Sequence, residues 1–243
     1  MAQDLFVPGE EVADISDQLR GHGITTNDTH LVSSLCGISS QLHKLTFMTS
    51  FKTWYQPRVG DIVIGRIVSI EGRKWKVDVG APQHGRLMIS SVNLPGGELR
   101  RRDQTDELNM RSFFIEGDVL SAEVQQTNQD GSFTLHTRSE RYGKLEHGYF
   151  ARTESYLVKR ANRHIHTLDN GVGLIIGVNG RCWISGPRPM AAGQGESTKD
   201  MADAVLSVDR LRGVARTARA IEELTAERKF VTLESITARL ADM

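Results

Sequence analysis

The chain has 243 residues, and its 25% charged and 39% hydrophobic side chains are ordinary for a soluble globular protein; the length favours two or three small domains. Lys and Arg together number 30 and so do Asp and Glu, so net charge gives no sign of a nucleic-acid ligand. Cys36 and Cys182 are the only cysteines, which excludes a disulfide framework. No apolar run reaches the roughly 18 residues of a membrane span. An intracellular, reducing compartment is therefore expected.

Residues 1–56 are expected to form a separate small β unit, and residues 1–9 lack the basic and apolar regions of a signal peptide. Phe6-Val-Pro-Gly-Glu10 is typical of a strand that ends in a turn. Residues 30–37 and 41–48 alternate apolar and polar side chains around Gly37, which predicts two or three strands. So few strands cannot bury a useful core, and we therefore expect the unit to pack on the next domain or on a partner chain.

Residues 57–147 predict a five-stranded barrel of the OB type. The first strand carries apolar side chains two apart at Ile62, Ile64, Val68 and Ile70, with Gly65 in the middle, where a bend is easy. Four shorter strands are expected at residues 75–79, 85–89, 119–124 and 132–136. Asp-Gly at residues 130–131 predicts a hairpin between the last two. Barrels of this type commonly bind oligonucleotides on one face.

Residues 148–243 predict a small α+β domain. Strands are expected at residues 149–153, 173–176 and 181–185, and a loop at residues 188–199. A helix beginning near residue 200 should bury a stripe of apolar side chains, and Thr232 should cap a last short helix. The stripe consists of Leu211, Val214, Ala218, Ile221 and Leu224.

Several sequence strings resemble the RNA exosome cap subunit family known as ribosomal-RNA-processing protein four. They are Pro8-Gly-Glu10, Asn93-Leu-Pro-Gly-Gly-Glu-Leu-Arg-Arg-Arg102, Asp106-Glu-Leu-Asn-Met-Arg111, Glu116-Gly-Asp118, Leu135-His-Thr-Arg-Ser139, Tyr142-Gly-Lys-Leu145, Leu157-Val-Lys-Arg160 and Ile176-Gly-Val-Asn-Gly180. The last string is similar to the Gly-x-Asn-Gly signature of the family's KH-type domain. The resemblance covers nearly the whole chain.

The resemblance implies three domains: an N-terminal β domain at residues 1–56 that docks on a ring partner, an S-one-type OB-fold RNA-binding domain at residues 57–147, and a KH-type domain with C-terminal helices at residues 148–243. It implies a non-catalytic subunit that sits with other cap subunits on a ring of RNase PH-like proteins. It also implies RNA processing and decay in nucleus, nucleolus and cytoplasm. A free-standing OB/KH RNA-binding regulator is the alternative, and a partner-dependent N-terminal unit favours assembly over it.

The barrel offers cationic side chains for phosphates of single-stranded RNA. Arg73, Lys74, Lys76 and Arg86 are expected on adjacent strands, and Arg100, Arg101 and Arg102 lie in the loop at residues 93–111. That loop is either a solvated surface or a phosphate or partner contact. Trp75 is expected in the core or at a domain contact. Many barrels of this type carry an aromatic residue near the position of Lys76 and a histidine near that of Met88, and this sequence has neither, which argues against base stacking there.

The loop Gly177-Val-Asn-Gly180 is predicted to act as a tight structural turn in preference to an RNA clamp. KH domains approach RNA phosphates through a Gly-x-x-Gly backbone, but this loop lies between two strands and contains no basic residue. Asn179 and Gly180 are expected to supply the positive φ of the turn.

No catalytic, cofactor or metal site is predicted. Asp103, Asp106 and Glu107 lie in an Arg-rich loop, without the second carboxylate cluster that two-metal RNA hydrolysis needs. His164 and His166 have only Cys182 as a nearby third zinc ligand, so surface histidines in a basic segment are the favoured interpretation. Residues 148–190 form that segment, with 6 basic and 2 acidic side chains.

Overall fold

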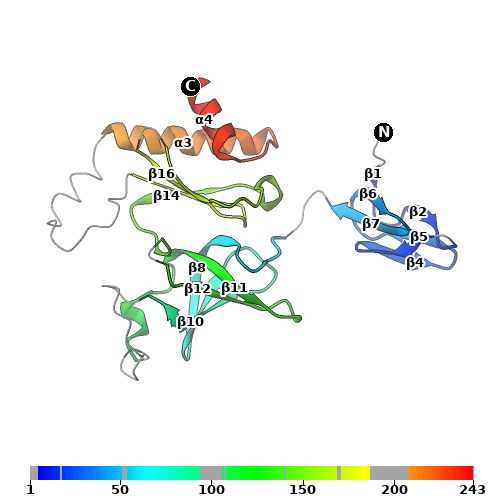
Figure 1. Cartoon of the computed structure of the whole chain (residues 1–243), viewed down its shortest axis with the longest axis horizontal. Coiled ribbons are helices and arrows are strands. Elements are labelled where there is room, and N and C mark those ends of the chain that lie inside the picture. Colours follow the sequence, from blue (N-terminus) through cyan, green and yellow to red (C-terminus); the bar gives the residue numbers. More distant parts are fainter. Residues whose placement is uncertain are drawn as a thin grey trace. The chain divides into compact units, whose positions relative to one another are not determined.

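The computed structural model describes residues 5–16, 18–50, 54–93, 106, 108–139, 141–168, 171–186 and 208–242. Contacts divide the chain into a first unit, Met1–Thr53, and a second unit, Trp54–Met243 (Figure 1). Among the described helices, none is long and apolar enough to cross a membrane.

The first unit contains seven short strands in two sheets. The strands are β1 (Leu5–Phe6), β2 (Glu11–Asp14), β3 (Leu19–Arg20), β4 (Ile24–Asn27), β5 (His30–Ser33), β6 (Gly37–Leu42) and β7 (Leu45–Ser50). One sheet has the order β1-β6-β7-β3 and the other β2-β5-β4. The prediction of two or three strands was wrong, because strands of two to four residues are too short to show a period of two. The unit also buries an apolar cluster of its own around Ile24, Leu31 and Met48.

The second unit begins with the five predicted strands of a closed barrel. They are β8 (Ile62–Glu71), β9 (Lys74–Asp78), β10 (Gly85–Val92), β11 (Val119–Thr127) and β12 (Phe133–Thr137). Antiparallel pairs join β10, β9, β8 and β11 in that order, and β12 pairs with both β10 and β11, which closes the sheet on itself. A two-residue strand, β13 (Gly143–Lys144), adds to β11, and a 3-10 helix, η1 (Met110–Ser112), follows the loop after β10. The predicted OB-type architecture is confirmed.

The barrel interior is filled by the alternate residues of these strands. Trp75 is fully buried there, its ring meeting Phe114 edge-on at 5.4 Å and its Nε1 donating a hydrogen bond to the Phe114 carbonyl at 3.2 Å. Trp75 is therefore a core residue and offers no stacking surface. Gly65 faces the same interior, where a Cβ would lie 2.3 Å from Cγ1 of Val77, so only glycine fits at this bend of β8.

A four-stranded antiparallel sheet follows, which we name the C-terminal sheet. It consists of β14 (Gly148–Arg152), β15 (Ile165–Thr167), β16 (Gly173–Ile176) and β17 (Arg181–Ser185), in the order β14-β17-β16-β15, with a 3-10 helix, η2 (Ser155–Leu157), after β14. Strand β15 was not predicted, because three residues give no measurable alternation. The helices α3 (Val208–Ala226) and α4 (Leu233–Asp242) complete the unit, and α3 lies along one face of the sheet (Figure 1).

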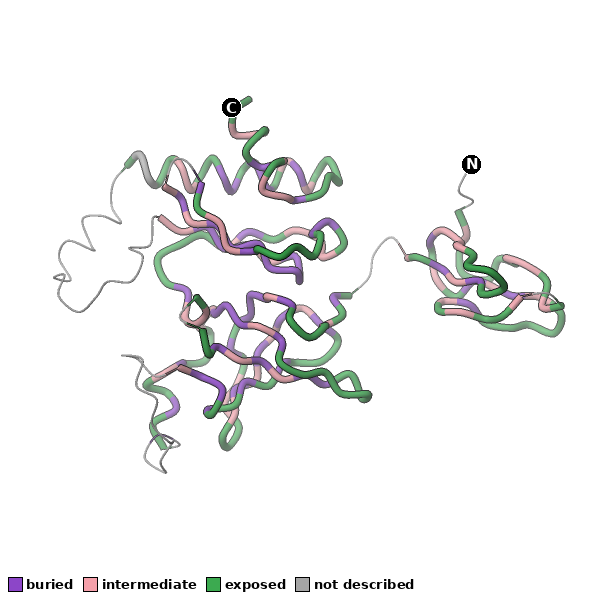
Figure 2. Tube along the Cα trace, viewed as in Figure 1, coloured by how far each residue is buried: buried purple, intermediate pink, exposed green. Residues whose placement is uncertain are grey.

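The apolar stripe of α3 packs on the C-terminal sheet, and Figure 2 shows buried positions concentrated between them and inside the barrel. Ala218, Ile221 and Leu224 are buried as predicted, whereas Leu211 is 53% exposed, so the predicted stripe was one residue too long. Thr232 caps α4 as expected: its Oγ1 accepts a hydrogen bond from the Ser235 N–H at 3.3 Å. The predicted loop at residues 188–199 and helix start near residue 200 lie outside the described residues.

Candidate nucleic-acid interface

The outer face of β9 and β10 carries three of the seven predicted cationic side chains. Lys74 and Lys76 alternate with buried residues of β9, and they point away from the barrel interior. Register pairs Lys76 with Arg86 and Lys74 with Met88, so cross-strand neighbours form two short rows on this face. Lys74, Lys76 and Arg86 thus lie together. Arg73 lies beside them in the turn between β8 and β9 rather than on the sheet face. Arg100, Arg101 and Arg102 lie outside the described residues.

The three cations differ in how far they are neutralised. Lys76 forms an ion pair with Glu71, and this bond, helped by the charges of Lys74 and Arg86, holds the pKa of Glu71 below its usual range. Within the described part of the chain, neither Lys74 nor Arg86 forms an ion pair. Because no described carboxylate is paired with them, Lys74 and Arg86 are the side chains best placed to attract an anion.

Two side chains that sequence reasoning did not place join the same side of the barrel. His136 faces outward from β12, next to β10, and Tyr142 follows β12 in the chain. Their rings meet edge-on, with centroids 6.3 Å apart. The parallel pairing of β10 with β12 places them on this side of the barrel, and no local sequence pattern predicts that pairing.

The loop Gly177–Gly180 connects β16 to β17 and bonds to the barrel. The Asn179 amide Nδ2 donates hydrogen bonds to the carbonyls of Ile64, at 2.8 Å, and Val79, at 2.7 Å. Its Oδ1 accepts one from the Ile64 N–H at 3.3 Å. The Val178 N–H donates to the Ile62 carbonyl at 3.0 Å. The turn itself closes through Gly180, whose φ is +76°. The expectation of positive φ at Asn179 was wrong, because the asparagine uses its side chain across the interface instead.

Two ion pairs flank this loop and also join the C-terminal sheet region to the barrel. Arg181 Nη2 lies 2.7 Å from Asp78 Oδ2, and Arg160 Nε lies 2.8 Å from Asp61 Oδ1. Partial burial acts to raise the pKa of Asp78, but hydrogen bonds from Arg181 and from the Gly80 N–H lower it overall. The hydrogen bond to Asp61 raises the pKa of Arg160. Asp78 and Arg160 are therefore charged at neutral pH.

Asp61 is the hub of the second pair. It is buried, and besides Arg160 it accepts hydrogen bonds from the Tyr55 hydroxyl at 2.8 Å and from the Arg58 N–H at 3.1 Å. Burial and the bond to Asp61 raise the pKa of Tyr55, which keeps it a neutral donor. Arg160 Nη2 also donates to the Gln56 carbonyl at 3.3 Å.

The histidines of the basic segment are not both at the surface. His164 is buried, with Nδ1 2.9 Å from the Ile176 carbonyl and Nε2 accepting from the Ala161 N–H at 3.2 Å. Both of its ring nitrogens are occupied, so the prediction of a surface residue was wrong for His164. Burial raises the pKa of Cys182 to about 12. Among the described residues, no three His, Cys, Asp or Glu side chains form a group that could hold a metal ion.

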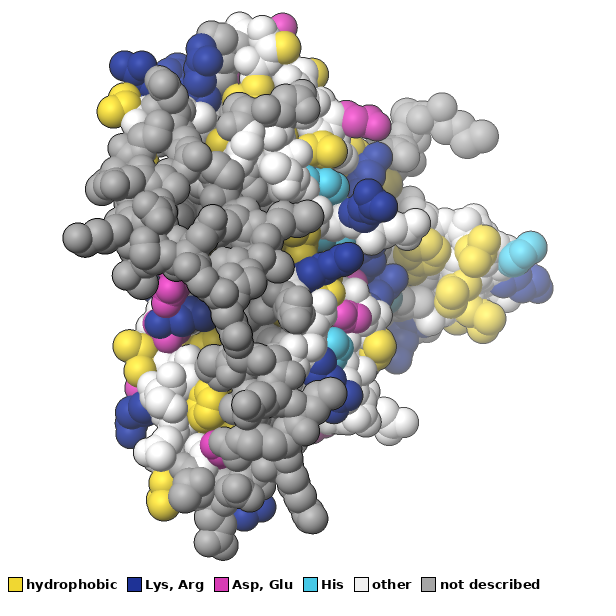
Figure 3. Space-filling view, turned by 60° about the vertical axis from the view of Figure 1, so that its left-hand side comes forward, with side chains coloured by type: hydrophobic (Ala, Val, Ile, Leu, Met, Phe, Trp, Pro, Cys, Tyr) yellow, Lys and Arg dark blue, Asp and Glu magenta, His cyan; other side chains and the backbone are white. Residues whose placement is uncertain are grey.

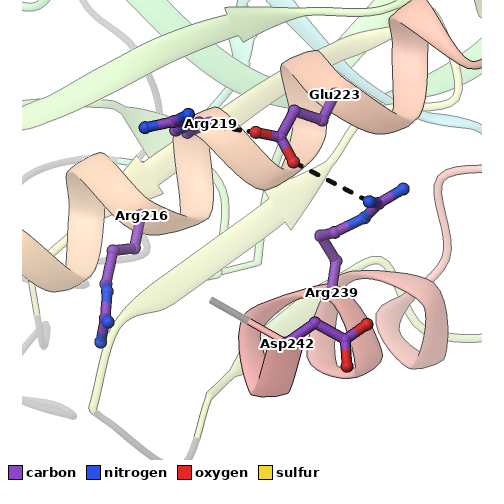
Figure 4. Close-up of a pocket in the computed structure, with 5 residues that line it drawn as sticks. All are labelled: Arg216, Arg219, Glu223, Arg239 and Asp242. Carbon is purple, nitrogen blue, oxygen red and sulfur yellow. Dashed lines mark hydrogen bonds and ion pairs between the residues drawn. The ribbon is translucent and has the colours of Figure 1, made fainter.

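An open pocket between α3 and α4 is lined by Arg216, Arg219, Glu223, Arg239 and Asp242 (Figure 4). Glu223 lies between two of the arginines, accepting a hydrogen bond from Arg219 Nε at 3.0 Å and standing 4.0 Å from Arg239 Nη1. The pair of Glu223 with Arg239 joins the two helices, and the two carboxylates offset most of the positive charge of the three arginines. The pocket is accordingly a weaker anion site than the outer face of β9 and β10.

Known protein families match both parts of the second unit. Residues 54–126 match the family described as the S1 domain of RRP4, and residues 148–190 match a KH domain family. A crystal structure of a candidate exosome complex RNA-binding protein superposes with a TM-score of 0.52 at 20% identity, covering 78% of this chain and 97% of that one. At that identity the superposition shows a shared fold.

Full-length relatives carry the same family name. The chain is 46% identical over 183 residues to exosome complex component rrp4 of Schizosaccharomyces pombe, with 75% of this chain and 56% of the relative covered. It is 47% identical over 180 residues to exosome complex component RRP4 of Saccharomyces cerevisiae, covering 74% and 50%. For exosome complex component RRP4 of Mus musculus the identity is 44% over 180 residues, covering 74% and 61%. The chain thus spans about half to three-fifths of the length of these curated relatives. By these matches, the chain belongs to the Rrp4 family.

Proposed function

We propose that this protein is a non-catalytic, RNA-binding cap subunit of the RNA exosome. In this role it helps to assemble the RNase PH-like ring with other cap subunits, and it guides RNA 3′ ends into the ring for rRNA processing and RNA decay in nucleus, nucleolus and cytoplasm. The relatives named exosome complex components support membership of the complex. The single structural observation that carries RNA binding is the cationic outer face of β9 and β10 on an OB-type barrel.

We also propose the domain division 1–56, 57–147 and 148–243. Its support is the division of the chain after Thr53 and the positions of the two family matches, 54–126 and 148–190. Tyr55 and Gln56 bond to Asp61 and Arg160 of the second unit, which supports a junction a few residues before position 57.

The first unit is proposed to dock on a ring partner. Leu45 is the cross-strand partner of both Leu19 and Leu42, so three leucines form one row across β3, β7 and β6. Leu19 is 64% exposed and Leu42 62%. Figure 3 shows hydrophobic side chains gathered on the surface of this unit. A contiguous exposed apolar surface on a small unit is typical of a protein-binding site.

Charging this row should release the subunit from the complex. Leu19→Glu together with Leu42→Glu, in the tagged full chain expressed in its own cells, is expected to shift the protein on size exclusion from the mass of the complex to that of a free subunit. Val59→Glu, which charges a similarly exposed side chain of the second unit, is the control and should leave the complex intact. If the double variant still elutes with the ring proteins, the leucine row is not the docking surface. If the unaltered protein elutes alone, the free-standing OB/KH regulator is the better description.

Phosphate binding by the barrel predicts a change in salt dependence. Lys74→Ala with Lys76→Ala should weaken binding to every single-stranded RNA alike and should flatten the slope of log affinity against log salt by about 0.7 for each phosphate that is no longer neutralised. Lys74 should contribute more, since Lys76 is paired with Glu71. Lys229→Ala, in the α3–α4 connection, is the matched control. An unchanged slope would remove these lysines from the interface.

The Gly177–Gly180 loop is proposed to hold the barrel and the C-terminal sheet together, rather than to clamp RNA. Its support is the set of three hydrogen bonds between the buried Asn179 side chain and the barrel backbone, two donated by Nδ2 and one accepted by Oδ1. Bonds made inward to protein leave these groups unavailable to a phosphate.

A further inference from the structure

A small polar cluster lies on the barrel's outer side, beside the cationic face. It consists of Glu123, His136 and Tyr142, and we call it the Glu123 cluster. Glu123 of β11 and His136 of β12 are direct cross-strand partners. The Tyr142 hydroxyl donates a hydrogen bond to Glu123 Oε2 at 2.9 Å, and the Tyr142 ring meets the His136 ring edge-on. The carboxylate thus fixes Tyr142, whose ring in turn packs against the His136 ring.

Strand order places this cluster on the same outer side of the barrel as the proposed phosphate-binding side chains. Leu87 of β10 pairs with Leu135 of β12, and the register shifts after this pair. Alternation within each strand turns the next residues, Met88 and His136, away from the barrel interior. Met88 is in turn the cross-strand partner of Lys74. A band across β9, β10, β12 and β11 therefore presents a cation, a thioether, an imidazole and a carboxylate in that order.

The cluster has hydrogen-bonding capacity that the described residues do not use. His136 Nδ1 is buried without a hydrogen-bond partner, and Nε2 stands 3.8 Å from Glu123 Oε2, beyond hydrogen-bond distance. Glu123 keeps Oε1 without a partner among the described residues, while its side chain remains 30% exposed. His136 Nδ1 is closed off from the surface, whereas the partly exposed Glu123 carboxylate is an acceptor that a ligand on this face can reach.

The charge of the cluster decides which part of an RNA strand fits it. A carboxylate repels a phosphate but accepts hydrogen bonds from the N–H groups of a base edge, as Asp and Glu do from the amino group of cytosine. Burial and the bond to Glu123 raise the pKa of Tyr142 to about 12, so its hydroxyl stays a neutral donor that fixes the carboxylate. Uracil presents a carbonyl where cytosine presents an amino group, and a carboxylate disfavours it.

We propose that the Glu123 cluster is a nucleobase-recognition site, which selects bases that carry an exocyclic amino group over uracil while Lys74 and Arg86 hold the neighbouring phosphates. This inference rests on the proposed RNA-binding function and adds base selectivity to it. The site would also replace the aromatic residue and the histidine that β9 and β10 lack. His136, on the strand that closes the barrel, would supply the imidazole, and Tyr142, in the segment after it, would supply the aromatic ring.

Cytosine and uracil 12-mers test the proposal, because they match in size and charge and differ in the base edge. The full chain should bind labelled C12 about tenfold more tightly than U12, the ratio that one hydrogen bond to a charged group provides. Glu123→Gln keeps an acceptor for Tyr142 and adds an N–H donor, so it should abolish the C12 preference without changing the salt slope. Glu116→Gln, at an exposed ion pair with Arg111, should keep it. Thermal melts establish that each variant is folded.

Three results would overturn the inference, and they are distinguishable. Equal affinity of the unaltered protein for C12 and U12 would refute base selection and leave RNA binding intact. A preference that survives Glu123→Gln would assign the selectivity to another site. Failure to bind either RNA at low salt would overturn the RNA-binding function together with the inference.

Discussion

Gly180→Val is expected to lower the free energy of unfolding of the second unit by about 3 kcal/mol or more, from backbone strain and overpacking combined. Gly180 has a φ of +76°, which a β-branched residue adopts only under strain. A Cβ there would also lie 2.4 Å from the Thr153 carbonyl oxygen and 2.8 Å from the Ser155 nitrogen. These are backbone atoms and cannot rotate away. For a unit of this size the melting temperature should fall by about 6–12 °C, which differential scanning calorimetry measures.

Gly72→Val is the matched control for this prediction. Gly72 has a φ of +55°, but nothing lies within 4 Å of a Cβ built on it. The control therefore carries the backbone strain without the clash, and it should cost about 1–3 kcal/mol. Equal destabilisation by the two variants would mean that crowding at Gly180 is unimportant. A Gly180→Val protein with an unchanged melting temperature and weakened RNA binding would show that the loop is an RNA clamp.

Asn179→Asp should destabilise the second unit by about 2–5 kcal/mol at neutral pH, because it places an unpaired charge in a buried site. The substitution keeps the shape of the side chain but removes both Nδ2 donors. The new carboxylate then faces the carbonyl oxygens of Ile64 and Val79 at about the distances of the original hydrogen bonds, 2.8 and 2.7 Å. Urea unfolding at several pH values measures the destabilisation.

The pH dependence of this variant has a definite sign. Burial and two facing carbonyls raise the pKa of the introduced carboxyl in the folded state above its unfolded value. The folded state therefore binds the proton more tightly, so the variant is least destabilised at low pH and loses stability as the pH rises through the folded pKa. Asn162→Asp, at an exposed position, is the control and should show little of this dependence. A destabilisation by Asn179→Asp that does not grow with pH would contradict a buried, unpaired carboxylate.

The sequence predicts the barrel well because its strands obey local rules. Alternation along residues 62–71 marks β8, Gly65 marks its bend, and Asp130-Gly131 marks the hairpin, where Gly131 has a φ of +81°. The same rules fail in the first unit and at β15. There, strands of two to four residues are fixed by pairing with distant segments rather than by their own pattern.

The candidate sites depend still more on distant pairings. The outward direction of Lys74 and Lys76 follows from alternation with Trp75, which the sequence shows. The position of His136 on the strand next to β10 follows from the parallel closure of β12 on β10, which the sequence does not show. Asn179 was expected to supply positive φ within its turn. Its amide instead reaches Ile64 and Val79, about a hundred residues away in the chain, and no residue type or spacing records such an interaction.

The bonds around Asp61 bear on how the second unit would carry a mechanical load. The chain enters this unit through Tyr55 and Gln56, and both residues form hydrogen bonds there. The Tyr55 hydroxyl donates to Asp61, and the Gln56 carbonyl accepts from Arg160. Arg160 belongs to the segment between β14 and β15, and Asp61 directly precedes β8. Tension on the chain ahead of Trp54 would therefore be divided at once between the barrel and the C-terminal sheet. Strand β8 would not detach from the barrel by itself, and the barrel and the C-terminal sheet would unfold together.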